Sequence, residues 1–445
     1  MRAAAYKLEL RELFRLALPV AAAQAGTQLM GLVDIAVLGR LGATELAAAG
    51  LGNVIFFGIS IAGMGMMMGV DPLISQAIGA GDLVRARRML WQGIWLALAV
   101  TAVLTAVLLG ALVALPRAHV QQELVEPAKV FVLIRMISLA PHLMFFVVRG
   151  YLQAHGTTRP MLVSMVVANI VNFIVDIVLV FGAGPIPALG IAGAAMATMI
   201  CTILQLVIIS LAVRKIHVDG HVDHRWSSRE IAQAARVGLP VALQMGLEVG
   251  VFALVGVLAA RLGTLHLAAH QIAIGLASFT YTVALGIAAA GSVRVGLAVG
   301  ARDTGAARIA GHVAFIAGAV VMATNGLAFA LFPRALARLI TNQENVIAFA
   351  IPLLLVAAVF QLSDGVQGVG AGVLRGAGDT KFALWANLAG HWLIGFPIAL
   401  WLGFRQQYGI VGLWWGLCAG LTVVAILLFA RFEGLSRSEI APLHQ

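Results

Sequence analysis

Charge is scarce in this sequence. Charged residues make up only 11% of the 445 positions, whereas hydrophobic residues make up 61%. A soluble domain carries about 25% charged and about 45–50% apolar residues. Once a core is filled, too few polar residues remain here to cover a surface that faces water. The composition excludes a soluble enzyme, a disordered chain and a secreted disulfide-rich module, and it indicates that lipid surrounds most of the chain.

Cysteine and the familiar catalytic patterns are also scarce. The two cysteines, Cys201 and Cys418, lie far apart inside apolar runs, as is typical of small buried hydrophobic residues rather than a redox pair. No Cys/His spacing indicates a metal site, and no GxxxxGK[ST] loop indicates ATP hydrolysis. No Ser/His or HExxH pair is present either. We therefore expect a protein that is not an enzyme and has no cofactor.

Acidic residues are fewer than basic ones, 19 against 29, which gives a net charge of +10. In a membrane protein such a surplus marks the cytoplasmic loops, so it does not call for a nucleic-acid partner. If the N-terminus is cytoplasmic, 21 basic residues fall at the inner ends of the spans and 7 at the outer ends. This bias predicts a multi-pass protein of the inner (plasma) membrane with both termini in the cytoplasm.

Long apolar runs are what the sequence has in abundance. A helix needs about 20 apolar residues to cross a bilayer. Cutting the chain at clusters of charge and turn residues leaves twelve such runs and so predicts an all-α membrane protein with twelve transmembrane helices. The predicted spans are 16–38, 46–70, 90–115, 128–150, 161–182, 190–213, 236–260, 267–293, 310–332, 346–373, 382–403 and 410–431.

The two halves of the chain are similar to each other. When residues 12–88 are shifted by 221 positions, 18 of the 77 residues are identical without a gap. Each half holds six spans, so the repeats run in the same direction and predict two parallel six-helix bundles. We expect an N-lobe over 1–213, a cytoplasmic linker over 214–235 and a C-lobe over 236–445. Such duplication is typical of secondary transporters, whose site lies between the halves near the midplane.

Four acidic residues lie inside predicted spans: Asp34, Asp176, Glu248 and Asp364. A charge at the bilayer centre costs about 2.5–3.5 kcal/mol even on the lenient insertion scale. The acids could be structural partners of buried arginines, but Arg135 is the one basic residue deep in a span. None of the four recurs at its repeat position, although the scaffold does. We interpret them as two distinct ion sites, one in each lobe, able to bind H⁺ or Na⁺.

Other polar and adaptable residues share helix faces with these acids. Gln24, Thr27, Gly31 and Asp34 form one stripe, and Asn169, Asn172 and Asp176 form another. Methionines at positions 64 and 67 could line an adaptable drug pocket or could simply pack. The residues we assign to a candidate substrate cavity are Gln24, Gln28, Met64, Met67, Asn169, Gln244, Phe360 and Gln367.

Several short motifs, in this order and spacing, make the chain resemble the multidrug and toxic compound extrusion (MATE) family over nearly its whole length. The motifs are Val33-Asp34-x4-Gly39-x-Leu41-Gly42, Gln76-x2-Gly79-Ala80-Gly81, Asn172-x3-Asp176, Gly190-x2-Gly193-Ala194-Ala195-x-Ala197-Thr198, Ala268-Ala269-His270-Gln271 and Gly372-x-Leu374-Arg375-Gly376-x-Gly378-Asp379-Thr380. Each motif alone is weak, whereas their combination within a repeat of six and six spans is specific.

The resemblance implies export of organic cations and drugs, driven by inward Na⁺ or H⁺. It implies an N-lobe cation site at Asp34, Asn172, Asp176 and Thr198. It also implies a C-lobe site at Glu248 and Asp364, as in the NorM-like branch, so that Na⁺ could bind at any of the four acids. That branch is expected to carry a tyrosine one turn before the second acid, where this chain has Phe360.

An alternative reading is a flippase for lipid-linked oligosaccharides, which shares the architecture of two six-helix bundles. A flippase would favour a cavity lined with arginines that hold a pyrophosphate, but the spans contain four acids and a single deep arginine. Cationic cargo is therefore preferred. We expect the partners to be small organic cations and the lipid bilayer, and we expect a monomer.

Overall fold

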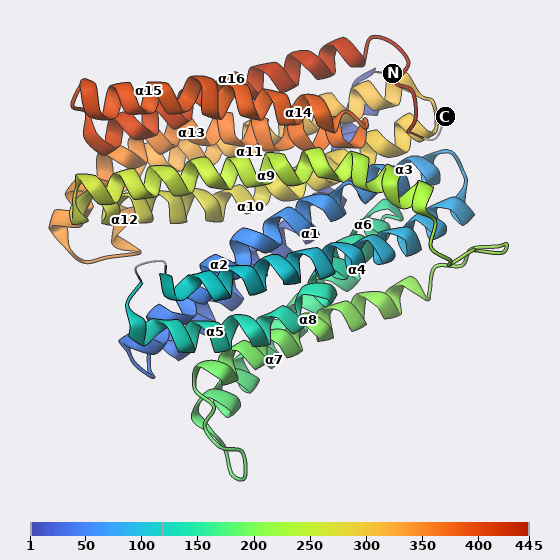
Figure 1. Ribbon diagram of the computed structural model, residues 1–445. Helices are drawn as coiled ribbons and strands as arrows, with labels where there is room; N and C mark the ends of the chain where they lie inside the picture. The colour runs from blue at the N-terminus through green and yellow to red at the C-terminus, as the bar shows by residue number, and fades with distance from the viewer. Residues whose placement is uncertain (1, 118–119, 444–445) are drawn as a thin grey trace. The chain divides into compact units, whose positions relative to one another are not determined.

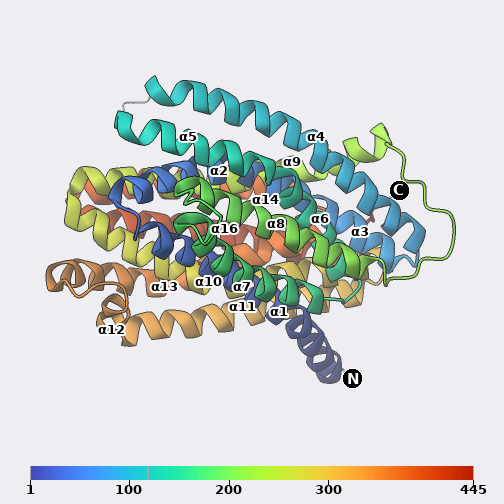
Figure 2. The same ribbon diagram turned by 90° about the horizontal axis from the view of Figure 1, so that it is seen from below.

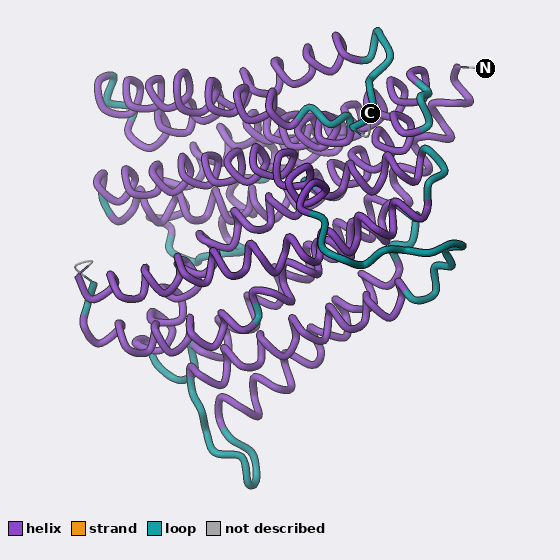
Figure 3. Tube along the Cα trace, turned by 45° about the vertical axis from the view of Figure 1, so that its right-hand side comes forward, coloured by secondary structure: helices purple, strands orange, loops and turns teal. Residues whose placement is uncertain are grey.

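The computed structural model describes residues 2–117 and 120–443, and helix occupies almost all of this part of the chain (Figure 3). Within these residues, eleven helices are long and apolar enough to cross a membrane, and the number reaches twelve if one bent pair counts as a single span. The prediction of an all-α membrane protein is confirmed.

Figure 1 shows the order of the helices along the chain. They are α1 (Arg2–Leu38), α2 (Ala43–Met68), α3 (Val70–Gly79), α4 (Leu83–Ala114), α5 (Gln122–Ile137), α6 (Leu139–Ala154), α7 (Arg159–Phe181), α8 (Ile191–Val213), α9 (Ser228–Leu262), α10 (Thr264–Gly300), α11 (Thr304–Leu331), α12 (Pro333–Arg338), α13 (Glu344–Gly376), α14 (Thr380–Asn387), α15 (Phe396–Leu400) and α16 (Gly409–Leu435).

The span predicted at 128–150 is the bent pair. Helices α5 and α6 meet at an angle of 43°, with Ser138 at the break. The Ser138 hydroxyl donates to the Arg135 carbonyl oxygen at 2.6 Å, which replaces part of the regular helical pattern. Pro141 follows within the first turn of α6 and has no N–H to donate to that pattern. These two residues account for the bend.

The span predicted at 382–403 is a helix of mixed pitch. Between α14 and α15 the chain forms a π-helical stretch over Leu388–Gly395, and a second one follows over Trp401–Arg405. The backbone of Gly420 in α16 approaches so closely that a side chain at Gly395 would lie 2.8 Å from its Cα. The wider π pitch places residues differently from a regular helix, and such stretches are frequent at functional sites.

Contacts between Cα atoms divide the chain into two compact units. Unit 1 comprises the chain up to Ala21, Ser75–Gly81 and everything from Leu243 onward, and unit 2 comprises Ala22–Ile74 and Asp82–Ala242. Two of the long helices, α1 and α9, therefore contribute residues to both units. Within unit 2, α7 and α8 pack side by side, as do α4 and α6 (Figure 2).

In unit 2, the end of α2 lies very close to the backbone of α9. A Cβ atom at Gly69 would overlap the backbone of Gly238 in α9, and one at Gly65 would lie 2.5 Å from the Cα of Ala242. Only hydrogen atoms fit between the two helices at these positions. Small residues at helix contacts let backbones approach in this way inside membranes.

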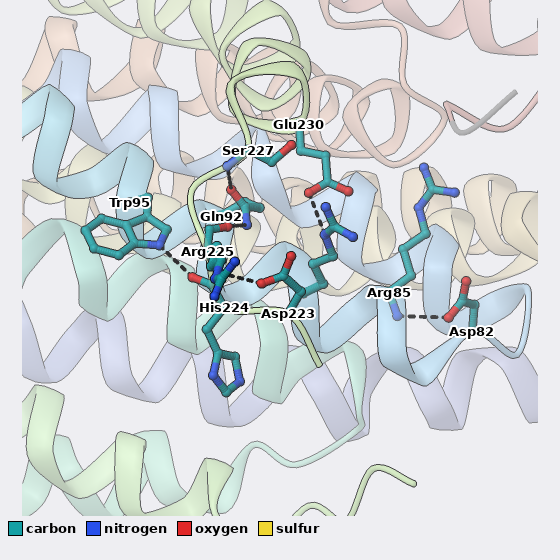
Figure 4. A network of polar contacts seen from close by, with 10 residues as sticks. Asp82, Arg85, Gln92, Trp95, Asp223, His224, Arg225, Ser227 and Glu230 are labelled. Atoms are coloured by element: carbon teal, nitrogen blue, oxygen red, sulfur yellow. Dashed lines mark hydrogen bonds and ion pairs between the residues drawn. The ribbon is translucent and has the colours of Figure 1, made fainter. Parts of the chain in front are cut away.

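The polar segment 214–227 lies along α4 in unit 2, and its contacts are drawn in Figure 4. The buried side chain of Gln92 meets the backbone of this segment with both of its polar atoms. Its Nε2 donates to the Arg225 carbonyl oxygen at 2.7 Å, and its Oε1 accepts from the Ser227 N–H at 3.0 Å. A glutamine inside an apolar helix is thereby satisfied, and the segment is attached to the helix.

Two arginines of α4 hold the ends of the same segment. Arg87 donates to the carbonyl oxygens of Val213 at 3.2 Å and Ile216 at 2.7 Å. Arg88 forms an ion pair with Glu230, in the first turn of α9, at 2.8 Å. The basic cluster that marks this end of α4 in the sequence is thus partly used to fix the connection between α8 and α9.

Candidate functional site

A small apolar cluster positions the polar residues of unit 2. Met30 of α1, Ala168 of α7 and Cys201 of α8 pack against one another and are buried. The Cys201 thiol lies 3.4 Å from the Ala168 carbonyl oxygen, and a Cβ at Gly26 would lie within 2.4 Å of the Met165 side chain. The three helices are therefore closely packed at this level, and the next turn of each carries a polar residue.

Those polar residues meet around the carboxyl group of Asp34. The hydroxyl of Thr198 donates to Asp34 Oδ2 at 3.2 Å, which links α8 to α1. The carbonyl oxygen of Ala194 in the same helix lies 3.1 Å from this hydroxyl and competes for its single hydrogen. A hydrogen bond to a charged group is worth about 1.5–3 kcal/mol.

Asp176 of α7 is fully buried and interacts electrostatically with Asp34 of α1. Among the described residues, neither oxygen of Asp176 has a hydrogen-bond partner. Two ionised carboxylates repel each other and have no hydrogen to donate, whereas a proton or another cation between them relieves the repulsion.

Asn172 lies one turn before Asp176 and is also fully buried. Its amide group faces both carboxyl groups, yet neither its Oδ1 nor its Nδ2 makes a hydrogen bond of normal geometry. Buried polar atoms are nearly always paired, and exceptions frequently mark a site for an unseen water or ion. Asp34, Asn172, Asp176 and Thr198 thus form one polar cluster within unit 2.

The residues of the candidate substrate cavity that fall in unit 2 lie in varied surroundings. Gln28 is exposed, Gln24 and Met64 are half-buried, and Met67 is fully buried in the core. The Asn169 amide nitrogen donates to the Met165 carbonyl oxygen at 2.9 Å in its own helix. The full burial of Met67 favours packing over an accessible pocket at that position.

In unit 1, Glu248 of α9 is the centre of a second polar cluster. Gln367 of α13 donates from Nε2 to Glu248 Oε2 at 3.2 Å, and Asn387 of α14 donates to the same oxygen at 3.4 Å. Asn387 is fully buried and is the last residue before the π-helical stretch. Three helices therefore converge on one carboxylate.

Tyr281 of α10 adds a hydroxyl to this cluster. Glu248 and Asp364 are both within electrostatic reach of its phenol, and Asp364 is itself buried. A Cβ at Gly368 would overlap the Tyr281 hydroxyl, so only glycine at that position leaves room for it. A tyrosine from α10 thus brings a hydroxyl close to the acids.

Phe360 does not occupy an equivalent place. Its ring packs against Trp414 at a centroid distance of 5.4 Å and against Phe252 at 6.0 Å, inside the apolar core of unit 1. Trp414 in turn donates to Nδ1 of His270 at 3.2 Å. Gln244, one turn before Glu248, is buried. Phe360, which has no hydroxyl, therefore packs among aromatic rings.

Among the residues that the structure describes, no group of three or more His, Cys, Asp and Glu side chains could hold a metal ion. Each cluster instead offers two carboxyl groups together with amide and hydroxyl oxygens. Oxygen ligands of this kind suit a hard cation such as Na⁺, which would be cargo rather than a resident metal.

Three residues of these clusters did not enter the predicted sites. Asn387 and Tyr281 come from spans for which no acid drew attention, although Tyr281 is one of only four tyrosines in the chain. Arg135 was noted as the one deep basic residue, and it lies within electrostatic reach of Asp34. Hydrophobic periodicity could not assign these three, because it does not show which helices are neighbours.

Comparison with known proteins identifies the family to which the chain belongs. The family model MatE matches residues 19–178 and 240–401, once in each half. The multidrug resistance protein NorM of Burkholderia vietnamiensis is 36% identical over 440 residues, covering 96% of this chain and 94% of that protein. A probable multidrug resistance protein NorM of Deinococcus radiodurans is 36% identical over 435 residues, covering 95% of each.

Solved structures agree in fold. The crystal structure of the eukaryotic MATE transporter AtDTX14 has a TM-score of 0.86 at 22% identity, covering 97% of this chain and 98% of that one. A MOP superfamily transporter from Pyrococcus furiosus has a TM-score of 0.88 at 23% identity, covering 97% of each chain. The two-bundle architecture predicted from the repeat is confirmed by these neighbours.

The fold is that of a multi-pass membrane transporter, not an enzyme. The chain belongs to the MATE family, and its relatives over nearly the full length are NorM proteins.

Proposed function

We propose that this protein exports organic cations and drugs in exchange for H⁺ or Na⁺ that flows inward, by alternating access between two lobes. The named function of its NorM relatives, multidrug resistance, supports drug export. Its buried acids support coupling to a cation, because a cationic cargo and a coupling ion compete for the same negative charge.

In the N-lobe the proposed site consists of Asp34, Asn172, Asp176 and Thr198. The observation that supports it is the buried cluster itself, in which Thr198 donates to Asp34. In the described part of the chain, both carboxyl oxygens of Asp176 and both polar atoms of the Asn172 amide lack a hydrogen-bond partner, which a proton or another cation could help to replace. Arrival of a coupling ion at the pair would neutralise it and release a cationic cargo. Gln24, Gln28, Met64 and Asn169 are proposed to contact cargo in the same lobe.

In the C-lobe the proposed site consists of Glu248 and Asp364, with Tyr281, Gln367 and Asn387 as neutral ligands. The hydroxyl of Tyr281 takes the role expected of a tyrosine at position 360. Amide, hydroxyl and carboxylate oxygens together suit Na⁺ in this lobe as in the N-lobe, and the acids of either lobe could bind H⁺ instead. Gln244 and Phe360 are proposed to shape the cavity beside this site.

We further propose that the N-lobe spans 1–213, the linker 214–235 and the C-lobe 236–445. The protein is proposed to lie in a bacterial inner membrane with both termini on the cytoplasmic side. The excess of basic residues at one set of helix ends supports this orientation. The protein is proposed to work as a monomer. A flippase is less well supported, because the NorM relatives are named for multidrug resistance and acids outnumber arginines inside the spans.

Reconstitution tests the proposal. The purified protein is reconstituted into vesicles that are loaded with ethidium. Export of ethidium is then followed under an imposed pH or Na⁺ gradient for the wild type, Asp34→Asn and Glu248→Gln. We expect gradient-driven export by the wild type and loss of the response to one gradient in each variant. Full gradient-driven export by both variants would refute the assigned roles, and export that depends only on ATP would refute the class of transporter.

A further inference from the structure

An exposed stripe runs along one face of α4 in unit 2. The residues of this stripe follow one another at steps of three and four, and all of them are exposed: Trp95, Leu98, Ala102 and Ala106. From Trp95 to the end of α4 at Ala114 the helix rises about 28 Å. That length is close to the hydrocarbon thickness of a bilayer, about 30 Å. Trp95 therefore marks the level at which α4 enters the membrane, and the stripe faces lipid.

The segment 214–227 adds a second tryptophan at this level. The rings of Trp95 and Trp226 lie 6.4 Å apart between centroids. Trp95 Nε1 donates to the His224 carbonyl oxygen at 2.9 Å (Figure 4), and Trp226 Nε1 donates to the Ser228 hydroxyl at 2.9 Å. The two tryptophans nevertheless remain 36% and 51% exposed. Hydrogen bonds thus hold two apolar rings at the membrane boundary, where tryptophan is enriched.

Positive charge accompanies this aromatic pair. Residues 214–229 contain four basic and two acidic residues, together with three histidines. Arg225 and Arg229 lie on either side of Trp226 in the sequence and are exposed, and within residues 2–117 and 120–443 neither guanidinium forms an ion pair. The Asp223 carboxylate accepts from the backbone N–H of Arg225 at 2.9 Å. Two positive charges are therefore available to a ligand at this segment.

The duplicated scaffold does not require these features. The helix related to α4 by the shift of 221 positions is α11, which carries Val313 where α4 has Gln92 and Ile316 where α4 has Trp95. The repeat-related helix therefore lacks both the glutamine that attaches the segment and the tryptophan that meets Trp226. The arrangement belongs to this segment alone, so it calls for a reason beyond the fold.

We propose that Trp95, Trp226, Arg225 and Arg229 form a binding surface for an anionic phospholipid in the leaflet at this end of α4. The proposal goes beyond the transport function. The phosphodiester of the head group pairs with the guanidinium groups, whose planar shape matches phosphate oxygens. The acyl chains follow the exposed stripe of α4. A soluble phosphate compound has no chains to bury there, so the surface fits a lipid.

Native mass spectrometry tests this surface, because it counts the lipids that stay bound to the purified full-length protein. The protein in detergent is titrated with phosphatidylglycerol, which is anionic, and with phosphatidylcholine, which has no net charge. We expect the wild type to bind phosphatidylglycerol on the order of tenfold more tightly. Arg225→Gln combined with Arg229→Gln should bring the two affinities together, whereas lysine at both positions should keep most of the preference.

Two further variants separate local charge from net charge and from apolar contact. Arg334→Gln combined with Arg338→Gln is the matched control, because it also removes two exposed arginines, which here pair with Glu344. This control should keep the preference of the wild type. Trp226→Ala removes apolar contact area but no charge, so it should weaken the binding of both lipids severalfold and leave their ratio unchanged.

The outcomes that would overturn the proposal are distinct. One is a wild-type preference for phosphatidylglycerol in the variant that lacks the charges of Arg225 and Arg229, and another is an equal loss of preference in the matched control. Displacement of bound phosphatidylglycerol by equimolar glycerol 3-phosphate would show a site for soluble phosphate compounds instead. Unchanged lipid binding by Trp226→Ala would contradict the role of the rings. Because no transport is measured, any of these failures leaves the proposed exchange function standing.

Discussion

The hydroxyl of Thr198 in α8 donates a hydrogen bond to Asp34 Oδ2 in α1 at 3.2 Å. This contact ties the carboxyl group that lies beside Asp176 to a helix that carries no acid. The Ala194 carbonyl oxygen competes with Asp34 for the single hydrogen of this hydroxyl, and a charged acceptor binds it more strongly than a neutral one.

Replacing Thr198 tests the importance of that bond. Thr198→Val keeps the shape of the side chain but removes the donor, which costs about 1.5–3 kcal/mol when the acceptor is charged. We expect ion-coupled ethidium export to fall about tenfold or more, and the free energy of unfolding to fall by no more than the cost of this bond. Thr198→Ser restores a hydroxyl and should recover most of the activity. Equal loss in both variants would contradict a role for the hydroxyl.

Gly368 makes room for Tyr281, so enlarging it should act through the tyrosine. Gly368→Ala is expected to push the hydroxyl away from Glu248 and Asp364 and to weaken Na⁺ binding severalfold, as Tyr281→Phe does by removing the hydroxyl. Measurement of Na⁺ binding by isothermal titration checks both variants. If the tyrosine acts as we infer, the double variant binds Na⁺ no more weakly than Tyr281→Phe alone. Independent, additive losses would contradict the inference.

Gly69 lies against the backbone of Gly238, so a methyl group there has no space. Gly69→Ala should lower the stability of the protein by about 1–3 kcal/mol, the usual cost of overpacking. Gly50→Ala is a matched control, because a Cβ at Gly50 meets no atom within 4 Å. Thermal unfolding in detergent compares the two. A transition temperature for Gly69→Ala equal to that of the control would show that the two backbones are farther apart.

Gln92 attaches segment 214–227 to α4 through two hydrogen bonds. Gln92→Leu removes both, at a net cost of about 0.5–1.5 kcal/mol for each bond. We expect the segment to be cleaved several times faster by a protease such as trypsin, which has Arg225 as a target within it. Gln121→Leu, at an exposed position, should leave the cleavage rate unchanged. Equal rates in all three proteins would contradict the attachment.

Asp223 makes the same segment sensitive to acid. The backbone N–H of Arg225 donates to its carboxylate at 2.9 Å, which lowers the pKa of Asp223 below its usual value. Because the folded pKa is lower than the unfolded one, ionised Asp223 stabilises the segment above the unfolded pKa, and this stabilisation is lost as the pH falls through the folded pKa.

Digestion with pepsin between about pH 2 and pH 5 measures this effect, since an unperturbed aspartate titrates near pH 3.9. We expect cleavage within 214–227 to rise at the acid end of that range in the wild type. Asp223→Asn should cleave at a rate that no longer follows the titration of this group. Unchanged pH dependence in Asp223→Asn would place the acid sensitivity in another residue.

The sequence predicted the architecture well because apolar run length and the internal repeat are direct consequences of a bilayer as solvent. Eleven or twelve spans are confirmed, and the family is confirmed by its relatives. The bend at Ser138 and the π-helical stretch after Asn387 were not predicted, because both arise from local hydrogen bonds and close helix contacts. A hydropathy pattern carries no information about either.

The candidate sites were predictable only in part. The four acids drew attention because charge in a span is costly, and Asn172 and Thr198 were assigned because their motifs resemble those of the MATE family. Their neighbours from other helices were less accessible to sequence reasoning. Tyr281 and Asn387 reach Glu248 from helices that hold no acid, and only tertiary packing brings them there.

Reciprocal exchange tests the central claim most directly. Vesicles containing the purified protein are given an ethidium gradient but no ion gradient, and the return movement of H⁺ and Na⁺ is recorded with a pH-sensitive dye and with ²²Na⁺. The account predicts that ethidium flux drives H⁺ or Na⁺ in the opposite direction. It also predicts that Asp34→Asn or Glu248→Gln abolishes the movement of that ion. Ethidium flux that moves neither ion in the wild type would contradict it.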